Sequence, residues 1–246
     1  MIKSKQTRQK VIGNILKICI ILSCTAGIVL HIVNDDSGFM NRIFLAFTIQ
    51  SNIWIALICM VFLLTGLIIK KHAIPEWLHI LKFMFTVSIL LTYLVFAVLL
   101  TPFMHWSYLI SLSNILLHTI TAILALADFL LDSYVYATKK RTLVTTGLIM
   151  PFLYSIFFFI YYEITNQMPV PYFFLDFKKY GWFNIGQQGI SVIYWMAVLC
   201  AVLVLTGYVI LWLKEKNNNI SKRTVIYTAI FMLLISVSFS ILNIVI

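Results

Sequence analysis

The stretch SYLISLSNILLHTITAILALADFLL, residues Ser107–Leu131, decides the fold class because it is apolar and long enough to cross a lipid bilayer. A helix needs about 20 such residues to span a hydrocarbon core of about 30 Å. Polar residues recur along the stretch at helical spacing, so we expect them to share one helix face. They are Ser107, Ser111, Asn114, His118, Thr121 and Asp128. Because polar side chains are costly in hydrocarbon, this face should point into the protein or a wet cavity.

Six further apolar runs of similar length indicate that the whole chain is a membrane protein. Hydrophobic residues make up 62% of the 246 residues, and charged residues make up 11%. Only helices and closed barrels satisfy their backbone in lipid, and uninterrupted runs of this length exclude a barrel. The predicted spans are Val11–Val33, Ile43–Ile69, Leu78–Thr101, Ser107–Leu131, Leu143–Tyr162, Gln188–Leu213 and Thr224–Ile246. We therefore predict an all-α, polytopic transmembrane bundle of seven spans, without a separate soluble domain.

The net charge of +10 is distributed unevenly between the two ends of these spans. Thirteen basic residues lie at the N-terminus and in the loops on its side, against three on the other side. The first group is Lys3, Lys5, Arg8, Lys10, Lys70, Lys71, Lys139, Lys140, Arg141, Lys214, Lys216, Lys222 and Arg223, and the second is Arg42, Lys178 and Lys179. The positive-inside rule then places the N-terminus in the cytoplasm and the C-terminus outside. The charge therefore indicates topology rather than nucleic-acid binding.

The remaining charged and thiol side chains are expected to be structural. Asp128 lies near the cytoplasmic end of span four, within expected reach of the basic segment Lys139–Arg141. Glu163 is expected at the outer membrane interface. The four cysteines are scattered within the spans without a CxxC motif or a His/Cys cluster, so the sequence predicts no metal site and no cofactor.

One connection is long, running from Glu163 to Gln187 on the outer side. A structureless loop of this length is usually functional or disordered, and its many aromatic residues argue against disorder. Two interpretations remain open: an aromatic belt at the membrane interface, or a lid over the outer mouth of the bundle.

Two side chains in the outer half of the predicted bundle are candidates for chemistry. His118 lies roughly 16 Å along its helix from Ser107, and a buried histidine is a candidate general base. Thr48 lies roughly 8 Å into its helix from Ile43, and its hydroxyl becomes a nucleophile only with a base in hydrogen-bond reach. The alternatives are a hydrogen bond between helices for His118 and a bond back to a carbonyl one turn earlier for Thr48. The spacing permits the pair but does not establish it.

Three segments resemble landmarks of the androgen-induced-gene family of integral membrane proteins, which includes a branch of short bacterial proteins. They are TIQSN (48–52), LLHTITAILALAD (116–128) and VPYFFLDFKKYG (170–181). Animal members of this family hydrolyse fatty acid esters of hydroxy fatty acids with an intramembrane threonine and histidine, which fall here on Thr48 and His118. The resemblance covers roughly Val11–Leu213, so residues 1–213 would form a six-span core and 214–246 an additional span in one transmembrane domain. Family members usually carry a proline four residues after the histidine, where this chain has Ala122.

The resemblance implies acyl transfer from a membrane lipid ester in a bacterial plasma membrane, with no cofactor, metal or nucleic acid involved. His118 would take the Thr48 proton, Thr48 would attack the ester carbonyl, and water would release the acyl group. The candidate substrate or oxyanion residues are Asn52, Asn114, Ser51 and Asp176, the last also a candidate to orient His118. The alternative is a small-solute or ion transporter or channel lined by the polar face of span four. The oligomeric state stays open.

Overall fold

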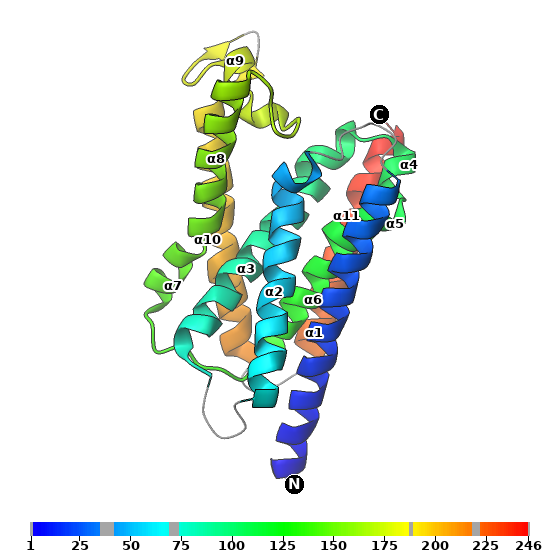
Figure 1. The fold of residues 1–246 in the computed structure, drawn as a ribbon, viewed down its shortest axis with the longest axis vertical. Coiled ribbons are helices and arrows are strands. Elements are labelled where there is room, and N and C mark those ends of the chain that lie inside the picture. Colours follow the sequence, from blue (N-terminus) through cyan, green and yellow to red (C-terminus); the bar gives the residue numbers. More distant parts are fainter. Residues whose placement is uncertain (1, 35–41, 69–73, 187–188, 218–221, 246) are drawn as a thin grey trace.

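The structure, a computed structural model, describes residues 2–34, 42–68, 74–186, 189–217 and 222–245 and is mostly helical (Figure 1). Within these described residues, seven helical segments are long and apolar enough to cross a membrane, so the predicted all-α polytopic bundle is confirmed. They are Gln9–Val33, Phe47–Ile68, Glu76–Phe103, Leu112–Leu131, Lys140–Thr165, Val192–Lys216 and Thr224–Ile241. Gln188, where we predicted span six to begin, lies outside the described residues.

Four helices form the centre of the bundle: α1 (Ile2–Val33), α2 (Phe47–Ile68), α3 (Glu76–Leu94) and α6 (Thr121–Leu131). The span that contains α3 is the most deeply buried of the seven. Its polar side chains tolerate this burial because their hydroxyls donate to the helix's own carbonyls. Thr86 Oγ1 donates to the Lys82 carbonyl at 2.7 Å, and Ser88 Oγ donates to the Met84 carbonyl at 2.9 Å.

Two spans contain a π-helical segment, η3 (Val95–Leu100) after α3 and η5 (Ile115–Ile120) before α6. A threonine directly after each segment returns its hydroxyl to a carbonyl five residues earlier. Thr101 Oγ1 donates to the Phe96 carbonyl at 2.9 Å, and Thr121 Oγ1 donates to the Leu116 carbonyl at 2.9 Å. Such wide turns occur frequently at functional sites, which draws attention to the place where the two segments meet.

The polar residues of span four do not share one continuous helix face. The stretch opens with α4 (Trp106–Leu109) and restarts at α5 (Leu112–Asn114), where Ser111 Oγ accepts the Asn114 N–H at 3.4 Å. The π-helical η5 then winds more widely than an α-helix. Our expectation of a single stripe from Ser107 to Asp128 is therefore wrong, because the helix is broken at Ser111 and wound differently around His118.

Asp128 joins three of the central helices through ion pairs inside the bundle. Its carboxylate oxygens lie 2.7 Å from Nζ of Lys17 on α1 and 2.7 Å from Nζ of Lys82 on α3. The carboxylate is 2% exposed. The expected partnership with Lys139–Arg141 is wrong, because lysines within the membrane spans provide the opposite charge that a buried carboxylate needs.

The remaining helices cover this centre. Span five consists of α7 (Lys140–Thr146) and α8 (Ile149–Thr165), and α10 (Val192–Asn217) packs against α3, α6 and α7. The last helix, α11 (Lys222–Val245), packs against α4, α6 and η3. The Tyr93 hydroxyl of α3 donates to the Met232 carbonyl of α11 at 2.5 Å, which ties the seventh span to the centre.

The outer connection between α8 and α10 is folded rather than extended. It contains the short helices η6 (Phe173–Leu175) and α9 (Phe177–Tyr180), followed by a hairpin of β1 (Ile185–Gly186) and β2 (Gly189–Ile190). Aromatic rings pack within it, as in the 5.1 Å contact between Phe177 and Trp182. The aromatic residues of this loop therefore give it a small core of its own.

Replacing Asp128 with asparagine should destabilise the protein, because two buried ammonium groups lose their shared carboxylate. We expect Asp128→Asn to lower the free energy of unfolding by about 3–5 kcal/mol, seen as a lower thermal midpoint in detergent. Glu163→Gln is the matched control, since Glu163 forms a solvent-exposed pair with Lys178 at 3.8 Å. Equal midpoints for Asp128→Asn and the wild type would contradict the structural role of Asp128.

Candidate active site

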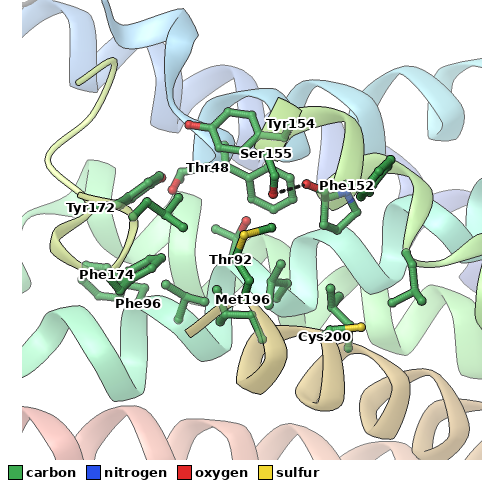
Figure 2. Close-up of a pocket in the computed structure, with 18 of the residues that line it drawn as sticks. Thr48, Thr92, Phe96, Phe152, Tyr154, Ser155, Tyr172, Phe174, Met196 and Cys200 are labelled. Carbon is green, nitrogen blue, oxygen red and sulfur yellow. Dashed lines mark hydrogen bonds between the residues drawn. The ribbon is translucent and has the colours of Figure 1, made fainter. Parts of the chain in front are cut away.

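A cavity of about 390 Å³ is lined by residues of the central helices α2 and α3 and by residues of α8 and α10 (Figure 2). We call it the membrane cavity. Its lining is mostly apolar, and the polar side chains among its lining residues come from six different segments. They are Thr48, Thr92, His118, Thr145, Tyr154, Ser155, Tyr172 and Cys200. Apolar walls with a few polar groups are typical of sites for small molecules.

The membrane cavity has an opening at the lipid boundary. Its lining includes Ile149 and Phe152 of α8, which are 43% and 61% exposed on the surface of a membrane span. Apolar side chains exposed at that depth face hydrocarbon. An apolar ligand dissolved in the bilayer can therefore reach the cavity from the side.

Thr48 lies in the first turn of α2, on the wall of the membrane cavity. Figure 2 shows the Tyr172 hydroxyl, from the outer loop, pointing towards the Thr48 side chain. The carbonyl one turn earlier, that of Phe44, accepts instead from Gln50 Nε2 at 3.1 Å. The Thr48 hydroxyl therefore faces a cavity and a second hydroxyl.

His118 lies in η5, 5% exposed, and also lines the membrane cavity. Its ring stacks on Phe96 of η3, with 3.9 Å between centroids, so the two π-helical segments meet at this contact. Within the described part of the chain, Nδ1 of His118 has no hydrogen-bond partner. A buried polar atom without a partner costs roughly 1–3 kcal/mol, so its retention calls for a functional explanation.

One amide fixes the position of Thr48 relative to His118. Asn52 Nδ2 donates to the Thr48 carbonyl at 2.8 Å and to the carbonyl of Leu117, which precedes His118, at 3.0 Å. Asn52 is fully buried, and its Oδ1 lies 3.5 Å from the Cys24 thiol. Both amide hydrogens are thus used within the protein, which makes Asn52 a positioning residue.

The other candidate residues from the sequence lie outside the lining of the membrane cavity. Asn114 Nδ2 donates to the Leu109 carbonyl at 3.0 Å, where it supports the start of the broken helix. Ser51 Oγ is 2.7 Å from Thr92 Oγ1 and connects α2 to α3. The two side chains therefore serve contacts within and between helices.

Asp176 also lies away from the membrane cavity. Its carboxylate accepts from the Tyr162 hydroxyl at 2.8 Å and from the Lys179 N–H at 3.1 Å, so it caps α9. These contacts hold the outer loop on the end of α8 and give no support to a contact with His118.

Sequence reasoning missed Tyr172, although it stands in the aromatic segment VPYFFLDF. Tyr172, Phe174 and Leu175 all line the membrane cavity, so the outer loop covers it, as the lid interpretation expects. A tyrosine hydroxyl within an aromatic loop could have marked Tyr172 as a candidate site residue. Nothing in the sequence, however, indicates that the loop folds back onto the start of α2.

The inner part of the polar face of span four is occupied by contacts between helices. Thr121 Oγ1 is 2.9 Å from Ser23 Oγ of α1, and Asp128 is paired with lysines on α1 and α3. The lining of the membrane cavity includes His118 but neither Thr121 nor Asp128. This arrangement gives no support to a transport path along the polar face.

Fold and cavity together define a multi-pass membrane protein in which a partly buried hydroxyl and a buried imidazole line one cavity. No protein-family model, curated protein or solved structure matches the chain. The resemblance of the three sequence segments to the androgen-induced-gene family therefore stays a prediction, and the membrane cavity is the structural feature that bears on function.

Removing the Asn52 amide should destabilise the contact between α2 and η5. We expect Asn52→Ala to lower the free energy of unfolding by about 2 kcal/mol, because two carbonyls lose their donor. Gln50→Ala on the same helix removes a partly exposed amide and should change it by less than about 0.5 kcal/mol. Thermal unfolding in detergent measures both variants, and an equal effect of the two would contradict the positioning role.

Proposed function

We propose that the protein is an intramembrane hydrolase of fatty acyl esters of membrane lipids, with Thr48 as nucleophile and His118 as general base. One observation carries the proposal: a hydroxyl and a buried imidazole, positioned through a shared amide, line one apolar cavity that is accessible from lipid. An acyl chain suits the apolar walls, with its ester carbonyl at the polar side of the cavity. The proposed setting is a bacterial plasma membrane, with lipid as substrate and no cofactor.

The reaction proceeds through two acyl transfers. His118 takes the Thr48 proton while Thr48 Oγ1 bonds to the ester carbonyl carbon, and the tetrahedral intermediate then expels the alcohol, which takes that proton from His118. In the second half, His118 takes a proton from water, and the hydroxide attacks the acyl-threonine. The fatty acid leaves, and the proton returns to Thr48.

The start of α2 offers donors for the negative charge that develops on the carbonyl oxygen. The N–H groups of Phe47 and Thr48 precede the first hydrogen bond of the helix, which runs from the Gln50 N–H to the Ala46 carbonyl at 3.1 Å. The helix dipole also favours negative charge at this end. These two N–H groups take the oxyanion role that the sequence suggested for Asn52 and Asn114.

The Tyr172 hydroxyl lies beside those donors. It points towards the Thr48 side chain (Figure 2), and Thr48 and Phe47 both lower its pKa. Burial raises the pKa of Tyr172 above its ordinary value, and these donors offset only part of the rise, so the phenol remains protonated. A substrate carbonyl replaces the phenol oxygen at the start of α2.

The test is hydrolysis of a panel of fluorogenic and branched fatty acyl esters by the purified protein in detergent. We expect Thr48→Ala and His118→Ala each to lower kcat by at least about 100-fold, because each removes a group that moves a proton or forms a bond. Thr65→Ala is the control on the same helix, since the Thr65 hydroxyl donates to the Val61 carbonyl at 2.9 Å. An inactive wild type, or hydrolysis indifferent to both changes, would overturn the proposal.

Removing the Tyr172 hydroxyl should free the donors at the start of α2. We expect Tyr172→Phe to lower KM about fivefold, which corresponds to about 1 kcal/mol, with kcat within about twofold of the wild type. Tyr227→Phe on the exposed face of α11 is the control, and steady-state kinetics with one ester measure all three proteins. A lower kcat at unchanged KM would instead assign the phenol to the transition state.

A further inference from the structure

A second cavity, of about 240 Å³, is lined by residues near the end of α10 and the beginning of α7. We call it the inner cavity, because the distribution of basic residues assigns this end to the cytoplasm. Its lining includes Lys214 and Glu215 of α10, Lys140 of α7, and Tyr134 from the connection between α6 and α7. It shares no residue with the membrane cavity.

Lys214, which we expected in a loop, is a buried residue of α10 with 5% exposure. Its Nζ donates to the carbonyls of Phe129 at 3.0 Å and Asp132 at 2.5 Å and lies 4.8 Å from the centre of the Phe129 ring. Among the described residues, no carboxylate lies within 4 Å of this ammonium group. Its hydrogen bonds satisfy two of its three donors, and both acceptors are uncharged carbonyls.

The nearby carboxylates are paired with other lysines. Asp128 pairs with Lys17 and Lys82, and Asp132 pairs with Lys82 at 3.1 Å and lies 3.5 Å from His79 Nδ1. Burial alone would raise the pKa of Asp132, but Lys82, His79 and Lys214 together hold it well below its ordinary value. Asp132 is therefore ionised.

Three buried ammonium groups, those of Lys17, Lys82 and Lys214, thus share two carboxylates. A buried charge without a counter-charge costs several kcal/mol. The excess positive charge is at Lys214, which lines the inner cavity. An anion in that cavity would offset it.

The rest of the inner cavity is compatible with one anionic group. Lys140 and Glu215 pair with each other at 3.0 Å and are partly exposed, so they add no net charge. The ring of Tyr134 stacks on His79 with 3.6 Å between centroids, which holds one wall in place. Leu143 and Leu211 supply an apolar wall, against which the acyl chain of a lipid can pack.

We propose that the inner cavity binds a phosphate group, carried by the headgroup of an anionic phospholipid in the cytoplasmic leaflet. Lys214 provides the charge and its third N–H donor. Basic pockets between transmembrane helices on the cytoplasmic side are suited to such headgroups, whereas a soluble anion would gain nothing from the apolar wall. The proposal is independent of the hydrolase proposal, because the two cavities share no residue.

The test is a titration of the purified full chain in detergent with short-chain phosphatidylglycerol and phosphatidylcholine, with bound lipid counted by native mass spectrometry. We expect the wild type to bind phosphatidylglycerol at least about tenfold more tightly, and Lys214→Met to lose this preference, because one charge-assisted hydrogen bond contributes about 1.5 kcal/mol or more. The matched control is Lys216→Met, since Lys216 is exposed on the same helix and lies over Trp212. Inorganic phosphate is titrated in parallel.

Each outcome decides between supporting and overturning the site. A preference for phosphatidylglycerol that needs Lys214 but not Lys216 supports it. Binding of inorganic phosphate that needs Lys214, without a lipid preference, overturns the assignment to a lipid. Equal binding of both lipids by the wild type overturns the site, and so does a preference that survives in Lys214→Met.

A second measurement keeps the test decisive if Lys214→Met folds poorly. In the wild type, phosphatidylglycerol should raise the thermal midpoint by several degrees more than phosphatidylcholine does. Equal midpoints of the wild type in the two lipids would overturn the proposal without any variant.

Discussion

The carboxylate of Asp128, held between Lys17 and Lys82, is the contact on which the central bundle depends. In a bilayer, apolar helix faces gain little from packing on each other rather than on lipid, so polar contacts and close packing determine how helices pair. These ion pairs connect α1, α3 and α6 at 2.7 Å on either side of one carboxylate. These ion pairs join α3 and α6. The segment η3, which follows α3, then meets η5, which precedes α6, at the contact where Phe96 stacks on His118.

The outer part of the bundle uses its polar groups differently. The Asn52 amide donates hydrogen bonds to two backbone carbonyls, and the hydroxyls of Ser51 and Thr92 hydrogen-bond with each other. Around the membrane cavity, the Thr48 hydroxyl faces the Tyr172 hydroxyl (Figure 2), and Nδ1 of His118 has no hydrogen-bond partner within the described chain. The π-helical turn around His118 also occurs without the proline expected four residues later, since the Thr121 hydroxyl bonds within the wide turn instead. The site therefore combines rigid supports with two side chains that face a space open to lipid.

Much of the fold follows from length and hydropathy, because each apolar run of bilayer length must become a helix. The positions of Thr48 and His118 in the outer halves of their spans also follow from rise per residue. The prediction of one polar face along span four was wrong because it assumed an uninterrupted α-helix. A new helix starts after Ser111, and η5 has the wider turns of a π-helix. The pairing of Asp128 with Lys17 and Lys82, and of Thr48 with Tyr172, depends on which distant segments meet, and a single sequence does not encode that in any local pattern. Lys17 in span one and Lys82 in span three could have predicted a buried ionic cluster, because a lysine within a membrane span needs an opposite charge.

The most direct test of the proposed chemistry is to look for the covalent intermediate. The purified protein would be mixed briefly with an activated fatty acyl ester, quenched in acid, digested and analysed by mass spectrometry. The account predicts a mass increase equal to one acyl group on the peptide that contains Thr48, absent from Thr48→Ala and strongly reduced in His118→Ala. Ester turnover with no acyl group on Thr48, or with the acyl group on another side chain, would contradict it.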